Sequence, residues 1–319
     1  MNIIRTNLRV INSFRRTDPD DMHHALDSIL PATICRSEFG ALTTLLDDGD
    51  PAVALTVRDK LHSYGADILP ALHAMAAHCA NRQMQANIQA VIQRFRMQEL
   101  DALLTDIRQA ALQRRDIDLE RAMLRISAFG TCDTDAEAIV STLDKFALRV
   151  HEVFISNRIQ NELNLVLSLN HVLFDEEKFR GADNDYYEPE NSFIQTMLVC
   201  RQGIPISLAV LYMLVAERCG IDIQGIGMPA HFVVYNADLN VYIDAYSKGV
   251  FLSRRDCKEF LANHGLRFSD EMLTPVNNIS IVARMLNNLM LAYSKKERRW
   301  EADALHHTLH ELQSCINGL

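Results

Sequence analysis

Two residues in the second half of the chain have the types and the spacing of an acid–base pair. His231 lies in the short apolar run 230–235, and Asp244 lies in the similar run 241–246. Both runs have the pattern of β-strands and are separated by turn-forming residues, so we expect neighbouring antiparallel strands. A carboxylate that holds one nitrogen of an imidazole leaves the other nitrogen available as a general base. The pair therefore indicates a site with acid–base chemistry.

The same pair also has a purely structural interpretation. A single histidine on a strand is more often a core residue with satisfied hydrogen bonds than a catalyst. A pair of histidines gives a weaker indication of a site. His306 and His310 are four residues apart on a predicted helix, which is the spacing of two metal ligands, but the sequence offers no third ligand. We therefore predict no metal site and no cofactor.

The elements that must position the pair begin with a long apolar segment. Pro205 fits the first turn of a helix, where its missing N–H has no partner to lose. Residues 206–219 are apolar almost all round and Gly220 ends the run, so we expect a central buried helix. Four short segments that alternate or run apolar follow it: 221–226, 230–236, 241–246 and 249–252. They predict an antiparallel meander packed on the central helix.

Helical patterns dominate the rest of the chain. In residues 1–110, Asp50 and Pro51 form an N-cap and first-turn pair, and residues 45–65 resemble a HEAT-type helical unit. A small helical domain is the simpler interpretation of that region. Ser192 and Gln195 have the spacing of a capping box. After Pro275, two helices of about residues 279–294 and 299–315 are expected.

Composition excludes several classes of protein. The chain has 319 residues and a net charge of −9, which argues against a nucleic-acid binder. No apolar run reaches the roughly 20 residues that span a bilayer, so no membrane segment is expected. The seven cysteines are scattered singly, a pattern typical of a reducing cytosol. Residues 1–16 are rich in arginine, and we interpret them as an ordinary leading segment rather than a transit peptide.

Residues 116–260 resemble the transglutaminase-like superfamily, and specifically its SirB-type branch of poorly characterised bacterial proteins. The matching residues occur in this order: Asn170, Phe174, Phe179, Arg180, Gly181, Asp185, Tyr186, Tyr187, Pro189, Asn191, Ser192, Arg201, Gly203 to Leu208, Pro229, His231, Phe232, Ile243 and Asp244.

The resemblance implies an α+β fold with a papain/transglutaminase-like core, in which a central helix packs on an antiparallel sheet between helical N- and C-terminal regions. It divides the chain into three parts. Residues 1–112 form a helical, HEAT-like domain, residues 113–275 form the transglutaminase-like domain, and residues 276–319 form a tetratricopeptide-like helical pair.

The resemblance also implies what is missing. In enzymes of this family a cysteine begins the central helix, where the helix dipole and an imidazolium favour the thiolate. His231 and Asp244 match the base and the carboxylate that orients it, but Pro205 stands at the position of the nucleophile. Ser207 lies about 200° further round the helix, so we expect it to pack or to bond at the helix start. Cys200 precedes the helix and is expected to be buried and inert.

We therefore predict a pseudoenzyme of the bacterial cytoplasm with a non-catalytic, regulatory or binding role, whose partner is a peptide or protein, with no nucleic acid and no membrane as partner. Its binding cleft should lie beside His231 and Asp244 and include these residues: Gly203, Pro205, Ser207, Tyr186, Tyr187, Asn191 and Arg201. The helical flanks would supply a docking surface. The alternative is a hydrolase or transferase that uses the pair as general base with water, Ser207 or Cys200.

Overall fold

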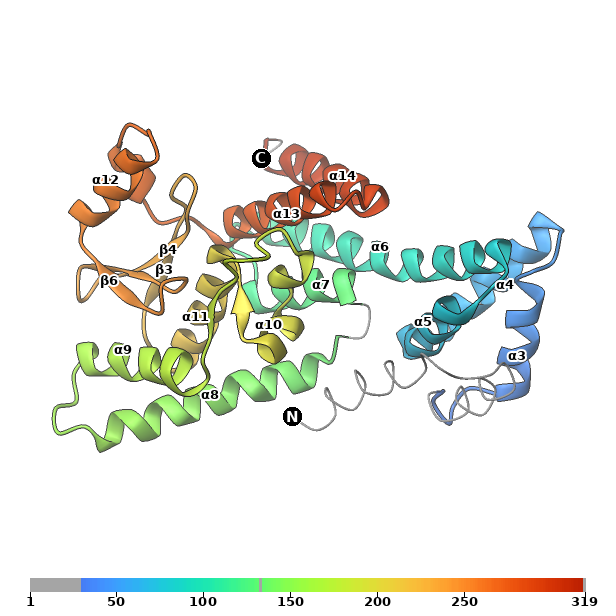
Figure 1. Ribbon diagram of the computed structural model, residues 1–319, viewed down its shortest axis with the longest axis horizontal. Coiled ribbons are helices and arrows are strands. Elements are labelled where there is room, and N and C mark those ends of the chain that lie inside the picture. The colour runs from blue at the N-terminus through green and yellow to red at the C-terminus, as the bar shows by residue number, and fades with distance from the viewer. Residues whose placement is uncertain (1–29, 132–133, 318–319) are drawn as a thin grey trace. The chain divides into compact units, whose positions relative to one another are not determined.

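The computed structural model describes residues 30–131 and 134–317, so the expectations for residues 1–16 lie outside the described residues. By its packing the chain divides into two compact units, residues 1–99 with 131–133, and residues 100–130 with 134–319. Helices dominate, and a small antiparallel sheet lies in the second unit (Figure 1). The predicted α+β class is confirmed. The three-part division stays a prediction, since compactness alone separates two units.

The first unit is helical, as predicted. Its elements are α3 (Arg36–Leu45), α4 (Pro51–Ser63), the short turn η2 (Ala66–Ile68), α5 (Leu69–His78) and the first part of α6 (Arg82–Leu112). Helix α4 begins at the expected cap, because the Asp50 carboxylate accepts the N–H of Ala52 at 2.8 Å and Pro51 occupies the first turn. Leu61 and Leu72 are fully buried in the core of this unit. The HEAT-type assignment stays a prediction.

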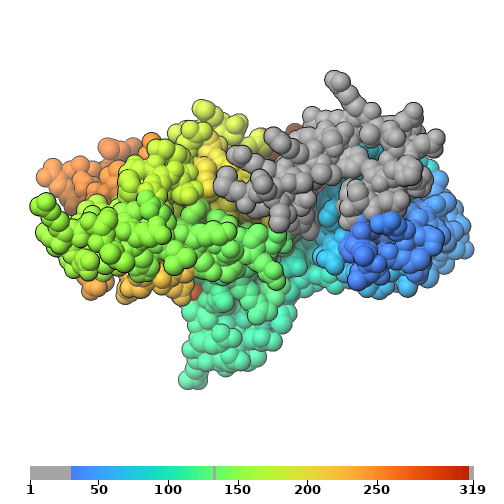
Figure 2. All heavy atoms as spheres, turned by 90° about the horizontal axis from the view of Figure 1, so that it is seen from below, coloured from blue at the N-terminus to red at the C-terminus, as the bar shows by residue number. Residues whose placement is uncertain are grey.

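A helical hairpin forms one side of the second unit. Helix α7 (Leu119–Thr131) leads to α8 (Ala136–Ser156), which packs against α9 (Glu162–Asn170) and the π-helical turn η3 (His171–Glu176). Figure 2 shows the face of this unit that α8 and α9 cover, in green. Asp135 and Asn161 cap α8 and α9 by accepting backbone N–H groups with their side chains, so both helices start at residues suited to the role.

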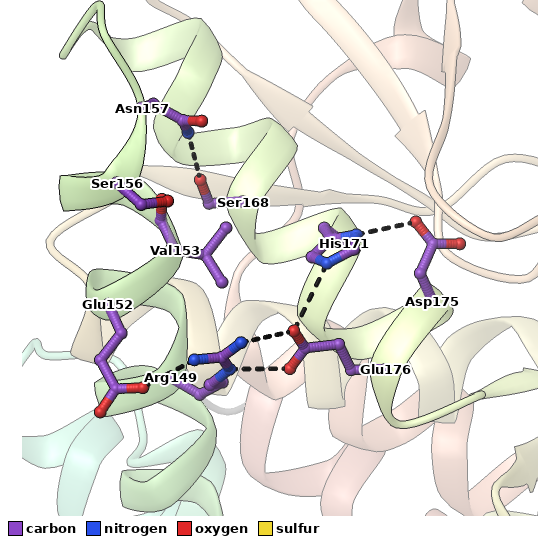
Figure 3. A network of polar contacts seen from close by, with 9 residues as sticks. All are labelled: Arg149, Glu152, Val153, Ser156, Asn157, Ser168, His171, Asp175 and Glu176. Atoms are coloured by element: carbon purple, nitrogen blue, oxygen red, sulfur yellow. Dashed lines mark hydrogen bonds and ion pairs between the residues drawn. The ribbon is translucent and has the colours of Figure 1, made fainter.

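A network of charged side chains fixes η3 to α8 (Figure 3). The guanidinium of Arg149 donates to both carboxylate oxygens of Glu176 at 2.9 Å and to Glu152 at 2.8 Å. His171 lies between Asp175 and Glu176, at 3.2 and 3.4 Å. The Arg149 guanidinium holds the pKa of the Glu176 carboxyl group below its ordinary value. The network orients η3, although exposed pairs of this kind stabilise a fold only modestly.

Helix α11 (Pro205–Arg218) is the central helix of the second unit. Buried side chains occur all round it, among them Leu208, Val210 and Tyr212. The strands follow it as a meander in chain order: β3 (Ile223–Ile226), β4 (Val233–Asn236), β5 (Val241–Asp244) and β6 (Val250–Leu252). α11 packs against β3 and β4, and α12 (Arg254–Asn263) follows the sheet. The predicted meander and its central helix are confirmed.

The segment before α11 differs from the sequence prediction. Ser192 does not cap a helix but ends the short 3-10 turn η4 (Pro189–Ser192), and α10 (Ile194–Cys200) starts two residues later without a side-chain cap. The side-chain carbonyl of Gln195 accepts the N–H of Asp135 at 2.9 Å. The predicted capping box is wrong, because the Gln195 side chain is hydrogen-bonded to the backbone of Asp135, the residue that precedes α8. Two short parallel strands, β1 (Arg180–Gly181) and β2 (Gln202–Gly203), flank this segment.

Two antiparallel helices close the second unit, as predicted. After the turn η5 (Asp270–Leu273) come α13 (Asn278–Lys295) and α14 (Arg299–Asn317), which pack on each other. Asn277 caps α13 by accepting the N–H of Ser280 at 2.9 Å. Their tetratricopeptide-type assignment stays a prediction. None of the helices in the described part of the chain has both the length and the apolar character needed to cross a bilayer.

Candidate functional site

His231 and Asp244 lie in contact within the second unit. Nε2 of His231 is 3.0 Å from Oδ2 of Asp244, and each side chain keeps only 10% of its surface exposed. The direction of the N–H falls short of a well-aligned hydrogen bond, so the contact is chiefly one of charge when the imidazole is protonated. The contact expected from the sequence is present, and it directs Nε2 of the ring towards the carboxylate.

The carboxylate of Asp244 is fixed by the turn that follows β5. Oδ1 accepts the N–H groups of Tyr246 and Ser247 at 3.0 and 3.2 Å, and Oδ2 accepts the Ser247 hydroxyl at 2.8 Å. Burial raises the pKa of the Asp244 carboxyl group, but its contacts with His231 and Ser247 outweigh burial and lower the pKa below its ordinary value. Asp244 is therefore a well-held anion at neutral pH.

His231 precedes strand β4 instead of lying on it, which corrects the sequence prediction. Residues 228–231 form a turn closed by the N–H of His231 and the carbonyl of Met228 at 3.2 Å. Pro229 takes the second position, and Ala230 takes the third with φ of +62°, where a type II turn favours glycine. The predicted strand begins three residues too early, because β4 starts at Val233 and the turn occupies residues 230 and 231. The left-handed Ala230 is a point of backbone strain beside the site.

The imidazole of His231 has aromatic neighbours and one free nitrogen. Its ring centroid lies 5.1 Å from that of Phe260 and 6.1 Å from that of Tyr246. Nδ1 has no hydrogen-bond partner among the described residues, and His231 lines a pocket. An imidazole with a carboxylate at Nε2 and a free Nδ1 has the arrangement of a general base.

The pocket beside His231 has a volume of about 740 Å³. It lies between the N-terminal end of α11, the 228–231 turn and one face of α13. Its walls combine apolar and polar side chains, among them Pro205, Ile206, Tyr186, Arg284 and Asn288. No aspartate or glutamate is among the described residues that line it. Its volume is in the range of pockets that hold small ligands, about 300–1,000 Å³.

The central helix brings Pro205 to this pocket but not Ser207. Pro205 is the first residue of α11 and lines the pocket together with His231. The Ser207 side chain is fully buried and engaged at the helix start: its hydroxyl donates to the carbonyl of Asn191 at 2.7 Å and accepts the N–H of Ile204 at 3.1 Å. Ser207 therefore braces the N-terminus of α11, and it does not line the pocket.

The other residues of the predicted cleft are divided between the pocket and its support. Tyr186 lines the pocket, whereas Tyr187 is exposed and packs edge-on against the Tyr186 ring at 5.2 Å. Asn191 donates to the carbonyl of Asp185 at 2.7 Å. Gly203 pairs with Gly181 in the two-stranded sheet. Tyr187, Asn191 and Gly203 do not line the pocket.

Arg201 has a structural position. Its guanidinium pairs with the carboxylate of Glu177 at 2.5 Å and lies over the ring of Phe179 at 4.7 Å. Its backbone adopts the left-handed conformation that ends α10, with φ of +58°. The residue is thus part of the packing beneath η3, and it does not line the pocket.

Cys200 is exposed, and the expectation of a buried thiol is wrong. It is the last residue of α10, and the chain turns away at Arg201. The neighbouring Leu198 faces the core instead and is buried. Cys200 does not line the pocket with His231, so the two residues have separate surroundings.

Sequence reasoning missed Arg284. Its Nη2 donates to the carbonyls of Met228 and His231, both at 2.7 Å, so it links α13 to the 228–231 turn. Within the described residues it has no carboxylate partner. A signal was present: Arg284 is a single charge inside the apolar run 281–286 of a predicted amphipathic helix.

The described residues contain no group of three or more histidine, cysteine, aspartate or glutamate side chains arranged to hold a metal ion. His306 and His310 lie on α14, and neither lines the pocket. The polar groups of the site are thus the His231 imidazole with the Asp244 carboxylate behind it, a guanidinium, amide side chains, and the hydroxyl groups of Tyr186 and Ser280.

Comparisons with known proteins agree with this fold. Residues 137–287 match the family model of the transglutaminase-like superfamily. F-box only protein 21 of Homo sapiens is 29% identical over 194 residues, 57% of this chain and 30% of that protein. A UPF0162 protein of Xylella fastidiosa is 32% identical over 145 residues, 43% of this chain and 51% of that protein. A UPF0162 protein of Vibrio cholerae is 26% identical over 133 residues, 40% of this chain and 49% of that protein.

The matches cover part of each protein. The chain spans about half the length of the bacterial relatives and less than a third of F-box only protein 21. No solved structure gave a significant match. The matched residues 137–287 contain α11, the whole sheet and the His231–Asp244 contact. The part of the chain that matches the transglutaminase-like superfamily, residues 137–287, is therefore the part that contains the candidate site.

Proposed function

We propose that the pocket beside His231 binds a peptide or protein segment and forms no covalent bond with it. The observation that carries the proposal is Pro205, whose ring lines the pocket at the start of α11. This is the position that the family resemblance gives to a nucleophilic cysteine. No cysteine is among the described residues that line the pocket, and the Ser207 hydroxyl is engaged elsewhere. These positions support a site without a nucleophile at the start of α11, since the serine that does line the pocket, Ser280, lies on α13 instead.

The shape and lining of the pocket support a bound peptide. Amide side chains of Asn287 and Asn288 and the guanidinium of Arg284 converge with apolar walls from Ile206 and Phe232. Apolar walls with a few placed polar groups are typical of sites that recognise small ligands. The proposal includes a regulatory role in the cytoplasm, the SirB-type assignment, and HEAT-like and tetratricopeptide-like flanks that dock a partner protein.

Binding is tested with fluorescein-labelled random hexapeptides and the full chain. Ala283 lines the pocket on α13, so Ala283→Trp should fill it and weaken peptide binding about tenfold or more, measured by fluorescence polarisation. The exposed Ala262 on α12 provides a matched control, and Ala262→Trp should bind as the wild type does. Equal binding by Ala283→Trp and wild type would contradict the proposal, as would the absence of any binding.

A second function is favoured by the free Nδ1 of His231. With Asp244 at Nε2, the imidazole is able to take a proton from a water molecule in the pocket, so the chain would act as a hydrolase without a covalent intermediate. Mass spectrometry of the hexapeptides after incubation distinguishes the two functions. Intact peptides support binding alone, whereas cleavage or deamidation that is lost in His231→Ala would establish the hydrolase.

The variant Pro205→Cys examines the missing nucleophile directly. We expect no amide hydrolysis and no amine incorporation from it, because a thiol at this position also needs oxyanion donors and substrate alignment, and errors near 1 Å cost about 100-fold. Turnover by this single variant would mean that the rest of a catalytic site is intact, and would overturn the binding proposal in favour of a recent loss of activity.

A further inference from the structure

The charges around the pocket are unbalanced. Arg284 is half-buried in the pocket wall, and none of the acidic side chains in the described residues forms an ion pair with it. Its Nη2 is occupied by two backbone carbonyls, so Nη1 and Nε keep N–H groups that no described protein group accepts. Burial lowers the pKa of the guanidinium, but arginine remains charged at neutral pH. A partly buried cation that contacts only backbone carbonyls and the Phe232 ring, with no carboxylate beside it, attracts an anion.

The other groups at the pocket favour a negative charge as well. Asp244 is the nearest carboxylate to His231, but it does not line the pocket and is occupied by Ser247 and Tyr246. The amides of Asn287 and Asn288 line the same wall as Arg284 and donate N–H groups. One guanidinium with neutral donors matches a singly charged carboxylate better than a doubly charged phosphate group.

We propose that the pocket holds a carboxylate of its peptide ligand, with Arg284 as the group that binds it. This inference rests on the proposed peptide-binding function and adds the chemistry of the ligand. The carboxylate comes either from the C-terminus of the peptide or from an acidic side chain, and in both cases an oxygen accepts a free N–H of Arg284, on Nη1 or on Nε. The chain as a whole carries a net charge of −9, so the pocket is a local exception that selects such a ligand by charge complementarity.

Four pools of fluorescein-labelled hexapeptides test the inference on the full chain. Two pools share random neutral sequences and differ only in a free or amidated C-terminus. Two amidated pools differ only in Glu or Gln at the fourth position. We expect one carboxylate pool to bind about tenfold or more tightly than its neutral match, as for a hydrogen bond to a charged group, and the preferred pool identifies the source of the carboxylate. The preference should weaken with added salt.

Variants of α13 provide the decisive comparison. Arg284→Gln should abolish the preference between matched pools, and Arg284→Lys should restore part of it. Lys295→Gln removes one positive charge from an exposed position of the same helix outside the pocket and should leave the preference unchanged. Because Arg284→Gln also loses bonds to the 228–231 turn, Asn288→Asp serves as a second variant. It adds a negative charge to the pocket without touching those bonds and should reverse the preference.

The outcomes separate this inference from the function on which it rests. Equal affinities for all four pools, or a preference that survives Arg284→Gln and Asn288→Asp, would overturn the carboxylate inference and leave peptide binding intact. Failure of every pool to bind the wild-type chain would overturn both.

Discussion

The two ends of helix α11 border pockets of similar size and opposite electrostatic character. At its C-terminal end a pocket of about 860 Å³ is lined by residues including Asp116, Asp118, Glu120 and Arg218. At its N-terminal end the pocket of about 740 Å³ contains Arg284 and no carboxylate among its described lining residues. Both pockets lie within the second unit, one at each end of α11.

Arg218 and three carboxylates at the C-terminal end have partners within the protein. Arg218 pairs with Glu120 and, at 2.7 Å, with Asp144. Asp116 accepts the N–H of Asn278 at 2.7 Å, and Asp118 accepts a backbone N–H in the first turn of α7. These carboxylates cap helices or pair with Arg218. The pocket is also lined by Arg115, Glu217 and Asp222, so acidic side chains outnumber basic ones in its wall.

The two arginines differ in whether a carboxylate partner lies beside them. Burial lowers the pKa of both guanidinium groups, but the ion pairs of Arg218 outweigh burial and raise its pKa, whereas the pKa of Arg284 stays lowered. Volume does not distinguish the pockets. The unpaired cation at the N-terminal end does, because it gains most from an anionic ligand, whereas acidic side chains predominate in the lining of the C-terminal pocket.

The first prediction concerns Arg218 and has the largest expected effect on stability. Arg218→Gln leaves the partly buried Glu120 without its partner, and we expect the free energy of unfolding to fall by about 1–3 kcal/mol. Urea denaturation measures the change. Arg255→Gln is the control, because Arg255 forms an exposed pair with Glu259 and should show no measurable loss. Weaker peptide binding by Arg218→Gln would contradict the structural role assigned to the C-terminal pocket.

The second prediction concerns the carboxylate behind the N-terminal pocket. Asp244→Asn should lower the free energy of unfolding at pH 7 by about 1–2 kcal/mol, because it loses the charged acceptor of the Ser247 and His231 contacts.

The effect of Asp244→Asn should depend on pH. The pKa of the Asp244 carboxyl group is lower in the folded chain than its ordinary value. Its contribution is therefore complete above the unfolded value of about 3.9 and is lost as the pH falls through the folded pKa. Denaturation of both proteins between pH 7 and pH 3 should show the difference shrinking only below about pH 4. A difference that is constant down to pH 3 would show that the carboxylate charge contributes nothing.

The third prediction is that Arg284→Gln changes stability by less than Arg218→Gln. It removes a desolvated charge along with two hydrogen bonds to backbone carbonyls, and these effects oppose each other, so a change of about 1 kcal/mol or less is expected. Urea denaturation of the two variants side by side provides the measurement. A larger loss for Arg284→Gln would make this arginine a structural clamp of the 228–231 turn and would reduce the contrast between the two pockets.

The fourth prediction concerns the strained turn and has the smallest expected effect. Ala230→Gly removes the cost of a left-handed alanine, about 1–2 kcal/mol, against an entropic cost of about 0.5–1 kcal/mol for glycine. The free energy of unfolding should therefore rise by about 0.5 kcal/mol. Ala262→Gly in the exposed face of α12 should instead lower it by up to about 1 kcal/mol. A loss in both variants would show that the turn carries no strain.

The sequence by itself determined the elements of the core. The segment between Pro205 and Gly220 is apolar on all sides, so as a helix it is stable only when it is buried on all sides, as α11 is. The runs around His231 and Asp244 were close enough along the chain to pair as neighbouring strands, so their contact followed from local pattern and short connection. Patterns of this kind depend only on residues that are near in sequence, and for that reason these elements could be predicted without the structure.

Only the tertiary structure decided which surfaces meet. Arg284 lies 53 residues after His231. The pattern of α13 marked it as a single charge in an apolar run, but did not indicate that it would contact the 228–231 turn. The partner of the Gln195 side chain, Asp135, is likewise distant along the chain. An amphipathic pattern states that a helix has a face to bury, but not against which partner. Whether a charge is balanced depends on that partner, so the structural arginine at one end of α11 and the unpaired arginine at the other look alike in the sequence.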